Sequence, residues 1–210
     1  MLDPAARTAG APPAAGAAPA ATVFVLSPAR CGGERAAQLV RSRESELGRL
    51  LREDGAPLGD VFAWLSALYF RGKLTYARRF ATPPPGRPGT LVMAPGHGLR
   101  APETRLSAAL LAAMGQVDVE SAAFVGPLRR DADLLERACG PDTRVVLLGS
   151  IATGKYLDTL LAVFGERLLF PADFVGRGDM SRGGLMLRCV MAGLELEYTP
   201  IKGAVRHGER

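Results

Sequence analysis

The sequence has few of the residues that build metal sites and disulfide frameworks. It contains three cysteines, at positions 31, 139 and 189, and two histidines, His97 and His207. None of them forms a C-x-x-C motif or a Cys/His cluster. An odd number of widely spaced cysteines argues against a disulfide scaffold, and the lack of clustered ligands argues against structural zinc. We therefore expect reduced thiols in a cytoplasmic protein, with no bound metal and no cofactor.

The sequence also lacks a long apolar run. No stretch approaches the roughly 20 apolar residues that a transmembrane helix needs, so we expect no membrane partner. The first 20 residues lack the basic start of a secretion signal, and three prolines interrupt their apolar segment. Their Ala/Pro/Gly composition is typical of disordered tails. We expect residues 1–20 to form such a tail and residues 21–210 to form a single α/β domain.

Positive charge is present in excess. Lys and Arg number 26 against 21 Asp and Glu, which gives a net charge of +5 and a pI near 9.5. Much of this excess is arginine, whose guanidinium group binds phosphate oxygens through two parallel hydrogen bonds. A basic balance permits nucleic-acid or anionic-ligand binding but does not require it, because a GC-rich genome produces the same composition.

Short apolar runs alternate with helical periodicities along the chain. We predict strands at residues 22–27, 89–94, 144–148, 167–170 and 195–200. We predict helices at 34–53, 58–80 (bent near Arg71-Gly72), 104–114, 127–138, 156–164 and 182–192, the last capped by Ser181. This alternation predicts a three-layer α/β fold, with a mainly parallel central sheet of about five strands flanked by helices.

Four loops that follow predicted strands combine glycine with basic residues: 27–35, 95–103, 149–156 and 171–182. Because ligands bind at the carboxyl ends of parallel strands, these loops predict a site for a phosphate-bearing ligand. We expect Arg30, Arg100, Arg177 and Arg182 to converge there. The full predicted ligand-binding set is Arg30, Gly32, Gly33, Gly98, Arg100, Gly149, Ser150, Thr153, Gly154, Lys155, Tyr156, Arg177, Gly178, Asp179, Ser181 and Arg182.

The third loop, GSIATGKY at residues 149–156, matches the P-loop pattern G-x-x-x-x-G-K between a strand and a helix. Tyr156 stands where a P-loop has the Ser or Thr that binds Mg²⁺, and no apolar strand ends in a second Mg²⁺-binding Asp. Three interpretations stay open: a P-loop nucleotide site with Mg²⁺, a turn that contacts phosphate, and a structural turn with Lys155 in solvent.

Three residues are candidates for catalysis. Cys31 lies in a loop before a helix, where a lowered pKa would favour a nucleophilic thiolate, although buried cysteines are more often inert. His97 lies between two glycines and could act as a general acid or base, or form one structural hydrogen bond. Asp179 could bind Mg²⁺, activate water or pair with a neighbouring arginine, and we favour the ion pair.

Four segments together resemble a group of small bacterial α/β domains of unknown function, similar to the peroxide-stress protein YaaA family. They are LSPARCGG (residues 26–33), FRGKLTYA (70–77), GLRAP (98–102) and LGSIATGKY (148–156). The resemblance spans roughly residues 22 to 182. The first segment departs from the Cys-x-Lys type of loop expected in that group. The resemblance implies nucleotide- or nucleic-acid-related biology and assigns no activity.

Three functions follow from these observations. The first is a nucleotide- or nucleic-acid-binding protein, including a nucleotide- or nucleoside-directed hydrolase. The second is a non-catalytic DNA-binding protein of the stress-response kind, which would present an extended basic surface. The third is a P-loop-like phosphotransferase. The sequence leaves open whether the chain is an enzyme.

Overall fold

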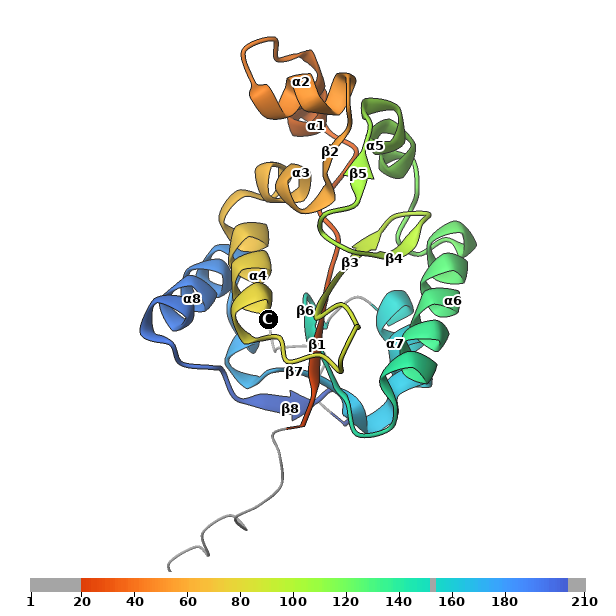
Figure 1. The fold of residues 1–210 in the computed structure, drawn as a ribbon, viewed down its shortest axis with the longest axis vertical. Helices are drawn as coiled ribbons and strands as arrows, with labels where there is room; N and C mark the ends of the chain where they lie inside the picture. The colour runs from red at the N-terminus through yellow and green to blue at the C-terminus, as the bar shows by residue number, and fades with distance from the viewer. Residues whose placement is uncertain (1–19, 152–153, 204–210) are drawn as a thin grey trace, which may run out of the picture.

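A mostly parallel six-stranded sheet forms the centre of the computed structural model, which describes residues 20–151 and 154–203, with backbone only at 154–155 (Figure 1). The strand order is β4-β3-β1-β6-β7-β8. Four neighbouring strands are parallel: β3 (Thr90–Ala94), β1 (Thr22–Leu26), β6 (Arg144–Leu148) and β7 (Leu168–Pro171). The short strands β4 (Gly98–Arg100) and β8 (Tyr198–Pro200) are antiparallel and form the two edges. The predicted α/β class is confirmed, and β4 is the strand of this sheet that the prediction missed. The short strands β2 (Ala56–Pro57) and β5 (Arg105–Leu106) were also missed, and β5 occupies the start of the predicted 104–114 helix.

Both faces of the sheet are buried, so successive side chains of β1 enter two different cores. Phe24 and Leu26 pack toward α3 (Leu58–Leu65) and α4 (Ala67–Phe80), and α8 (Asp179–Ala192) packs against α4. Val23 and Val25 pack toward α6 (Ala122–Cys139) and α7 (Gly154–Phe164). Continuous apolar runs are typical of parallel strands covered on both faces, which is why these strands were recognisable from sequence.

The parallel strands point toward a small group of elements at one end of the sheet (Figure 1). This group contains α1 (Glu34–Arg41), α2 (Glu46–Arg52), α5 (Ala108–Gly115) and a two-stranded ribbon of β2 (Ala56–Pro57) and β5 (Arg105–Leu106). Its elements belong to the connections that follow β1 and β3. They therefore lie over the sheet edge at which the predicted ligand loops emerge.

Two predicted helices are divided in the structure, and the predicted bend at Gly72 is wrong. The 34–53 helix separates into α1 and α2, because Ser45 accepts a hydrogen bond from the Gly48 N–H and starts a new helix. The 58–80 helix breaks at Ser66, where Ala67 adopts a φ of 45°. Helix α4 instead continues through Gly72 without interruption.

The remaining helix boundaries differ by a few residues. Helix α8 begins at Asp179 with Gly178 as its N-cap, so the predicted cap at Ser181 is wrong. Helix α6 begins at Ala122, before the predicted start, and includes Pro127 in its first turns. It has 18 residues with several charges, and within residues 20–151 and 154–203 no helix is long and apolar enough to cross a membrane. The predicted 1–20 tail lies almost wholly outside the described residues.

Candidate functional site

The sheet has a topological switch point between β1 and β6. The chain leaves β1 toward β3 on one side and leaves β6 toward β7 on the other, so the connections diverge between these two neighbours. Ser27 follows β1 and donates its backbone N–H to the Leu148 carbonyl of β6 at 3.1 Å. Gly149 follows β6, and a Cβ added to it would lie 2.8 Å from the Ser27 hydroxyl oxygen. Gly149 therefore packs directly against the Ser27 side chain, and a larger residue at this position would collide with it.

The buried amino group of Lys73 contacts Ser27 from the opposite side. Lys73 comes from α4, is 1% exposed and donates to the Ser27 carbonyl oxygen at 2.8 Å. Its Nζ lies 3.0 Å from the Ser27 hydroxyl oxygen and 4.6 Å from the centre of the Tyr69 ring. Burial lowers the pKa of Lys73 to about 7, although the Asp179 carboxylate opposes this shift. A lysine with this pKa is present partly as the neutral amine at physiological pH.

Close packing of α8 on α4 brings charged residues to the same place. A Cβ on Gly72 would lie 2.7 Å from the Gly183 carbonyl oxygen, so the two backbones are in direct contact. This contact places Arg182 over Phe174, whose carbonyl accepts from the guanidinium group at 2.9 and 3.1 Å. Asp179 lies 3.7 Å from the same guanidinium group and is largely exposed.

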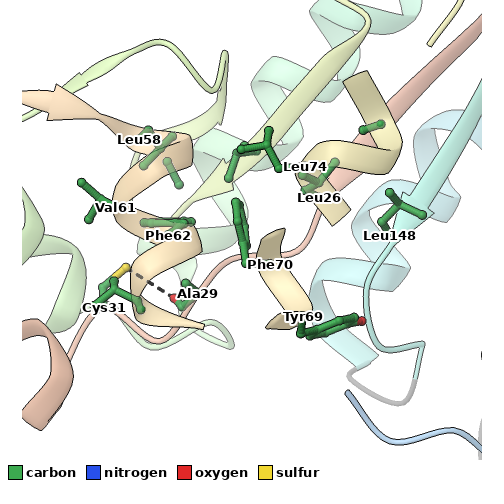
Figure 2. Close-up of a cluster of buried hydrophobic side chains, with 14 of the residues drawn as sticks. Leu26, Ala29, Cys31, Leu58, Val61, Phe62, Tyr69, Phe70, Leu74 and Leu148 are labelled. Carbon is green, nitrogen blue, oxygen red and sulfur yellow. Dashed lines mark hydrogen bonds between the residues drawn. The ribbon is translucent and has the colours of Figure 1, made fainter. Parts of the chain in front are cut away.

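The Tyr69 hydroxyl is the unsatisfied polar group of this cluster. Tyr69 is 8% exposed, and its hydroxyl makes no hydrogen bond of normal geometry to a described group, although the Arg182 guanidinium group lies close enough to interact with it. Burial raises the pKa of Tyr69 to about 12, while the nearby Arg182 guanidinium opposes that rise. Figure 2 shows the hydroxyl directed away from the hydrophobic cluster, on the side where β6 ends at Leu148. Buried polar groups are usually hydrogen-bonded, so this hydroxyl is an exception among the described residues.

Several predicted residues lie in the loops around this switch point. Gly149 and Ser150 follow β6, and the buried Tyr156 donates its hydroxyl to the Ser150 carbonyl oxygen. Tyr156 therefore supports the loop from within. Gly154 begins α7, whereas Thr153 and the Lys155 side chain lie outside the described residues.

Four arginines were expected to converge on one site, and two of them, Arg30 and Arg177, are exposed. Arg30 lies in the loop after β1. Arg177 donates to the Asp173 carbonyl at 2.8 Å and lies 3.5 Å from the Ser181 hydroxyl. Gly178 caps α8, so its position is explained by the helix start.

Arg100 does not join the other arginines. It lies on the edge strand β4 and pairs with Asp131 of α6 at 2.8 Å. Four strand positions separate β4 from β7, which is about 19 Å at the usual strand spacing. Gly98 allows this arrangement, because a Cβ there would collide with the Asp131 carboxylate and the Pro127 carbonyl. His97 forms the β3–β4 turn and lines a small cavity of about 50 Å³ together with Arg100.

The surroundings of Cys31 disfavour a thiolate. It is 5% exposed, its thiol donates to the Ala29 carbonyl at 3.4 Å, and burial raises its pKa to about 12 (Figure 2). This is opposite to the lowered pKa that a nucleophilic cysteine needs. Gly32 packs directly on the backbone of Gly115. Cys31, Gly32 and Gly33 line an apolar cavity of about 350 Å³ between α1 and α5.

Sequence reasoning did not single out Ser27, Tyr69 or Lys73. A signal for Lys73 was present, because the chain has only three lysines against many arginines, and position 73 falls on the apolar side of its helix. Ser27 gave no such signal, since nothing in the sequence indicates that Lys73 contacts it. The pairing of these two residues required the fold.

Comparison with known proteins found no matching family model, no matching curated protein and no matching solved structure. The resemblance to the YaaA family therefore stays a prediction. Among the residues that the structure describes, no group of three or more His, Cys, Asp and Glu side chains is arranged to hold a metal ion.

Proposed function

We propose that this chain binds a small phosphate-bearing ligand, of the nucleotide or sugar-phosphate type, at the carboxyl ends of β1 and β6. The observation that carries the proposal is the Lys73 amino group, buried on Ser27 at the switch point of the sheet. Burying an amino group is costly, and such residues are concentrated at functional sites.

Other groups at the switch point supply donors for a phosphate. The Arg182 guanidinium group is largely buried and lies near the Tyr69 hydroxyl. Helix α7 begins at Gly154, directly after the β6 loop, and the N-terminus of an 11-residue helix favours anions. The Asp179 carboxylate has the same sign of charge as a phosphate group and opposes its binding, but the Asp179 side chain is exposed. The set supports a phosphate-bearing ligand.

The proposal is tested by calorimetric titration with inorganic phosphate, nucleoside mono-, di- and triphosphates, and the same nucleosides without phosphate. We expect binding that requires the phosphate group and weakens at least tenfold in Arg182→Gln. The matched control is Arg129→Gln on α6, which removes a half-exposed arginine on the other side of the sheet. Absence of binding for every phosphate compound would refute the proposal, and so would equal effects of the two variants.

A second candidate function is nucleic-acid binding on the outer face of α4. Arg71, Arg78 and Arg79 are exposed along this helix. Arg71 and Arg78 line a groove of about 510 Å³ in which the Arg35 guanidinium group lies 5.2 Å from the Trp64 ring centre. Arginines beside an aromatic ring are typical of sites for single-stranded nucleic acid.

Fluorescence anisotropy with a labelled single-stranded oligonucleotide tests this second function. We expect affinity to fall steeply with salt, and Arg71→Gln to weaken binding while Arg129→Gln does not. Binding that is insensitive to salt or to Arg71→Gln would exclude this surface as the interface.

A further inference from the structure

We infer that Ser27 and Lys73 form a serine–lysine pair in which the Ser27 hydroxyl is a nucleophile toward phosphorus. This inference rests on the proposed function for its substrate class, a phosphate ester or anhydride. The geometry is that of a nucleophile and its base, with Nζ and Oγ 3.0 Å apart. The Ser27 carbonyl, 2.8 Å from Nζ, accepts a second hydrogen bond and orients the amine.

The choice of lysine at this position is informative in a chain dominated by arginine. Arginine stays protonated under all physiological conditions and cannot accept a proton from serine. Lysine can do so once burial has lowered its pKa, and Lys73 is the fully buried member of the pair. A neutral amine donates one N–H to the Ser27 carbonyl and keeps a lone pair for the Ser27 hydroxyl proton.

The surroundings of Ser27 and Lys73 also distinguish this pair from one that only stabilises the end of β1. The rings of Tyr69 and Phe70 lie 4.6 and 4.7 Å from Nζ and shield it from water. The charged groups that act on the cluster are Asp179 and Arg182 from α8, with Tyr156 from α7 adjoining Tyr69. Gly149 packs directly against the Ser27 side chain, where a Cβ would collide with the hydroxyl oxygen, and Ser27 keeps 8% of its surface exposed for a phosphate group to approach.

The reaction proceeds in two balanced steps. In the first, Ser27 Oγ forms a bond to phosphorus and the bond from phosphorus to the leaving oxygen breaks. The hydroxyl proton passes to Lys73 Nζ and then to the leaving oxygen. In the second, water attacks the phosphoserine, the Oγ–P bond breaks, and Lys73 transfers a proton from water to Ser27 Oγ. The sum is hydrolysis of the phosphate ester or anhydride.

The test is covalent labelling of the full chain with diisopropyl fluorophosphate, followed by intact mass and peptide mapping. We expect one adduct at Ser27, formed with loss of fluoride, at a rate that rises with pH around 7. Ser27→Ala should remove the adduct. Lys73→Met and Lys73→Arg should each slow labelling on the order of 100-fold or more, since general-base catalysis contributes about that much. Lys202→Met, which removes an exposed lysine, should leave the rate unchanged.

Folding of each variant is checked by circular dichroism, and Lys73→Arg keeps the positive charge if Lys73→Met does not fold. No adduct at Ser27 between pH 6 and 10, or equal labelling rates in wild type and folded Lys73→Arg, would overturn the inference. This failure is separate from failure of the proposed function. If phosphate binds but Ser27 is not labelled, the proposed binding site stands and the nucleophile is refuted. If Ser27 is labelled but phosphate does not bind, the nucleophile stands and the proposed ligand class is refuted.

Discussion

Gly72 of α4 and Gly183 of α8 are in backbone contact, and neither position has room for a Cβ. A Cβ on Gly183 would lie 2.7 Å from the Leu68 carbonyl oxygen, and one on Gly72 would lie 2.7 Å from the Gly183 carbonyl oxygen. This contact fixes the distance between the two helices that carry Lys73 and Arg182. The candidate site therefore depends on a pair of residues that do not take part in it chemically.

We predict that Gly183→Ala lowers the free energy of unfolding by about 1–3 kcal/mol, the usual cost of overpacking a close contact. Gly184→Ala is the control. A Cβ at this neighbouring position would meet only the flexible end of the Arg188 side chain at 3.3 Å. Alanine is a better helix former than glycine, so this variant should be neutral or stabilising. Urea unfolding measures both, and equal effects at 183 and 184 would contradict the packing argument.

The stability contributed by position 73 should depend on pH. Because burial lowers the folded-state pKa of Lys73 from 10.5 to about 7, the unfolded chain binds more protons between these values. Stability of the wild type relative to Lys73→Met should therefore rise with pH from 7 to 10, by up to about 1.4 kcal/mol per pH unit. Below pH 7 the difference should be constant.

Urea unfolding at pH 6, 7, 8 and 9 measures this slope, and Lys202→Met provides the exposed control. Tyr69 and Cys31, whose folded-state pKa values burial raises to about 12, are present in both proteins, so their titration cancels in the difference. A difference between wild type and Lys73→Met that stays flat across all four pH values would contradict the lowered pKa.

Two buried tyrosines should respond differently to loss of the hydroxyl group. The Tyr76 hydroxyl accepts from the Leu196 N–H at 2.7 Å and shares a hydrogen bond with Tyr198, whereas the Tyr69 hydroxyl has no described partner. We expect Tyr76→Phe to cost about 1–3 kcal/mol and Tyr69→Phe to be neutral or stabilising. If thermal unfolding shows the same loss for both variants, the Tyr69 hydroxyl has a structural partner.

Asp131 should hold the β3–β4 turn against α6 by charge. Its carboxylate accepts from the Leu99 N–H and pairs with Arg100 and Arg130. Burial raises the pKa of Asp131, but these hydrogen bonds more than offset it and leave the pKa below the usual value. A group with a lowered pKa stabilises the fold at neutral pH, and this contribution is lost as acid protonates it.

We expect Asp131→Asn to lose about 1–3 kcal/mol at pH 7, with the loss relative to wild type shrinking as the pH falls below 4. Asp133→Asn on the same helix is the control, because Asp133 pairs only with the half-exposed Arg129 among the described side chains and should matter little. Denaturant unfolding at pH 7 and pH 3 distinguishes the two variants.

The strands were the predictable part of this fold because they are buried on both faces. β6 has the predicted bounds, and β1 and β3 differ from the prediction by one residue. Each is a run of four apolar residues that follows a Thr or Arg and lies between polar or glycine-containing turns. β4 was missed because three residues containing glycine and arginine give no such signal. The α3–α4 break was missed because it depends on the φ of Ala67, which no breaker residue announces.

The candidate site was less predictable, because its contacts join distant segments. The loops were located by the rule that ligands bind at the carboxyl ends of parallel strands, and the structure places Ser27 and Gly149 there. Side-chain direction and partners were not available from that rule. Arg100 was expected in the pocket and instead pairs with Asp131, while Lys73 was expected in a helix without a role.

We expect the two edge strands to limit self-association of this protein. An open parallel edge offers a row of free N–H and C=O groups to another chain and promotes aggregation. Here each edge is occupied by a strand of three residues that runs against its neighbour, and β8 ends in Pro200, which has no N–H to donate. Substitutions that lengthen or straighten β4 or β8 should therefore be detected first as turbidity during concentration, before any change in melting temperature.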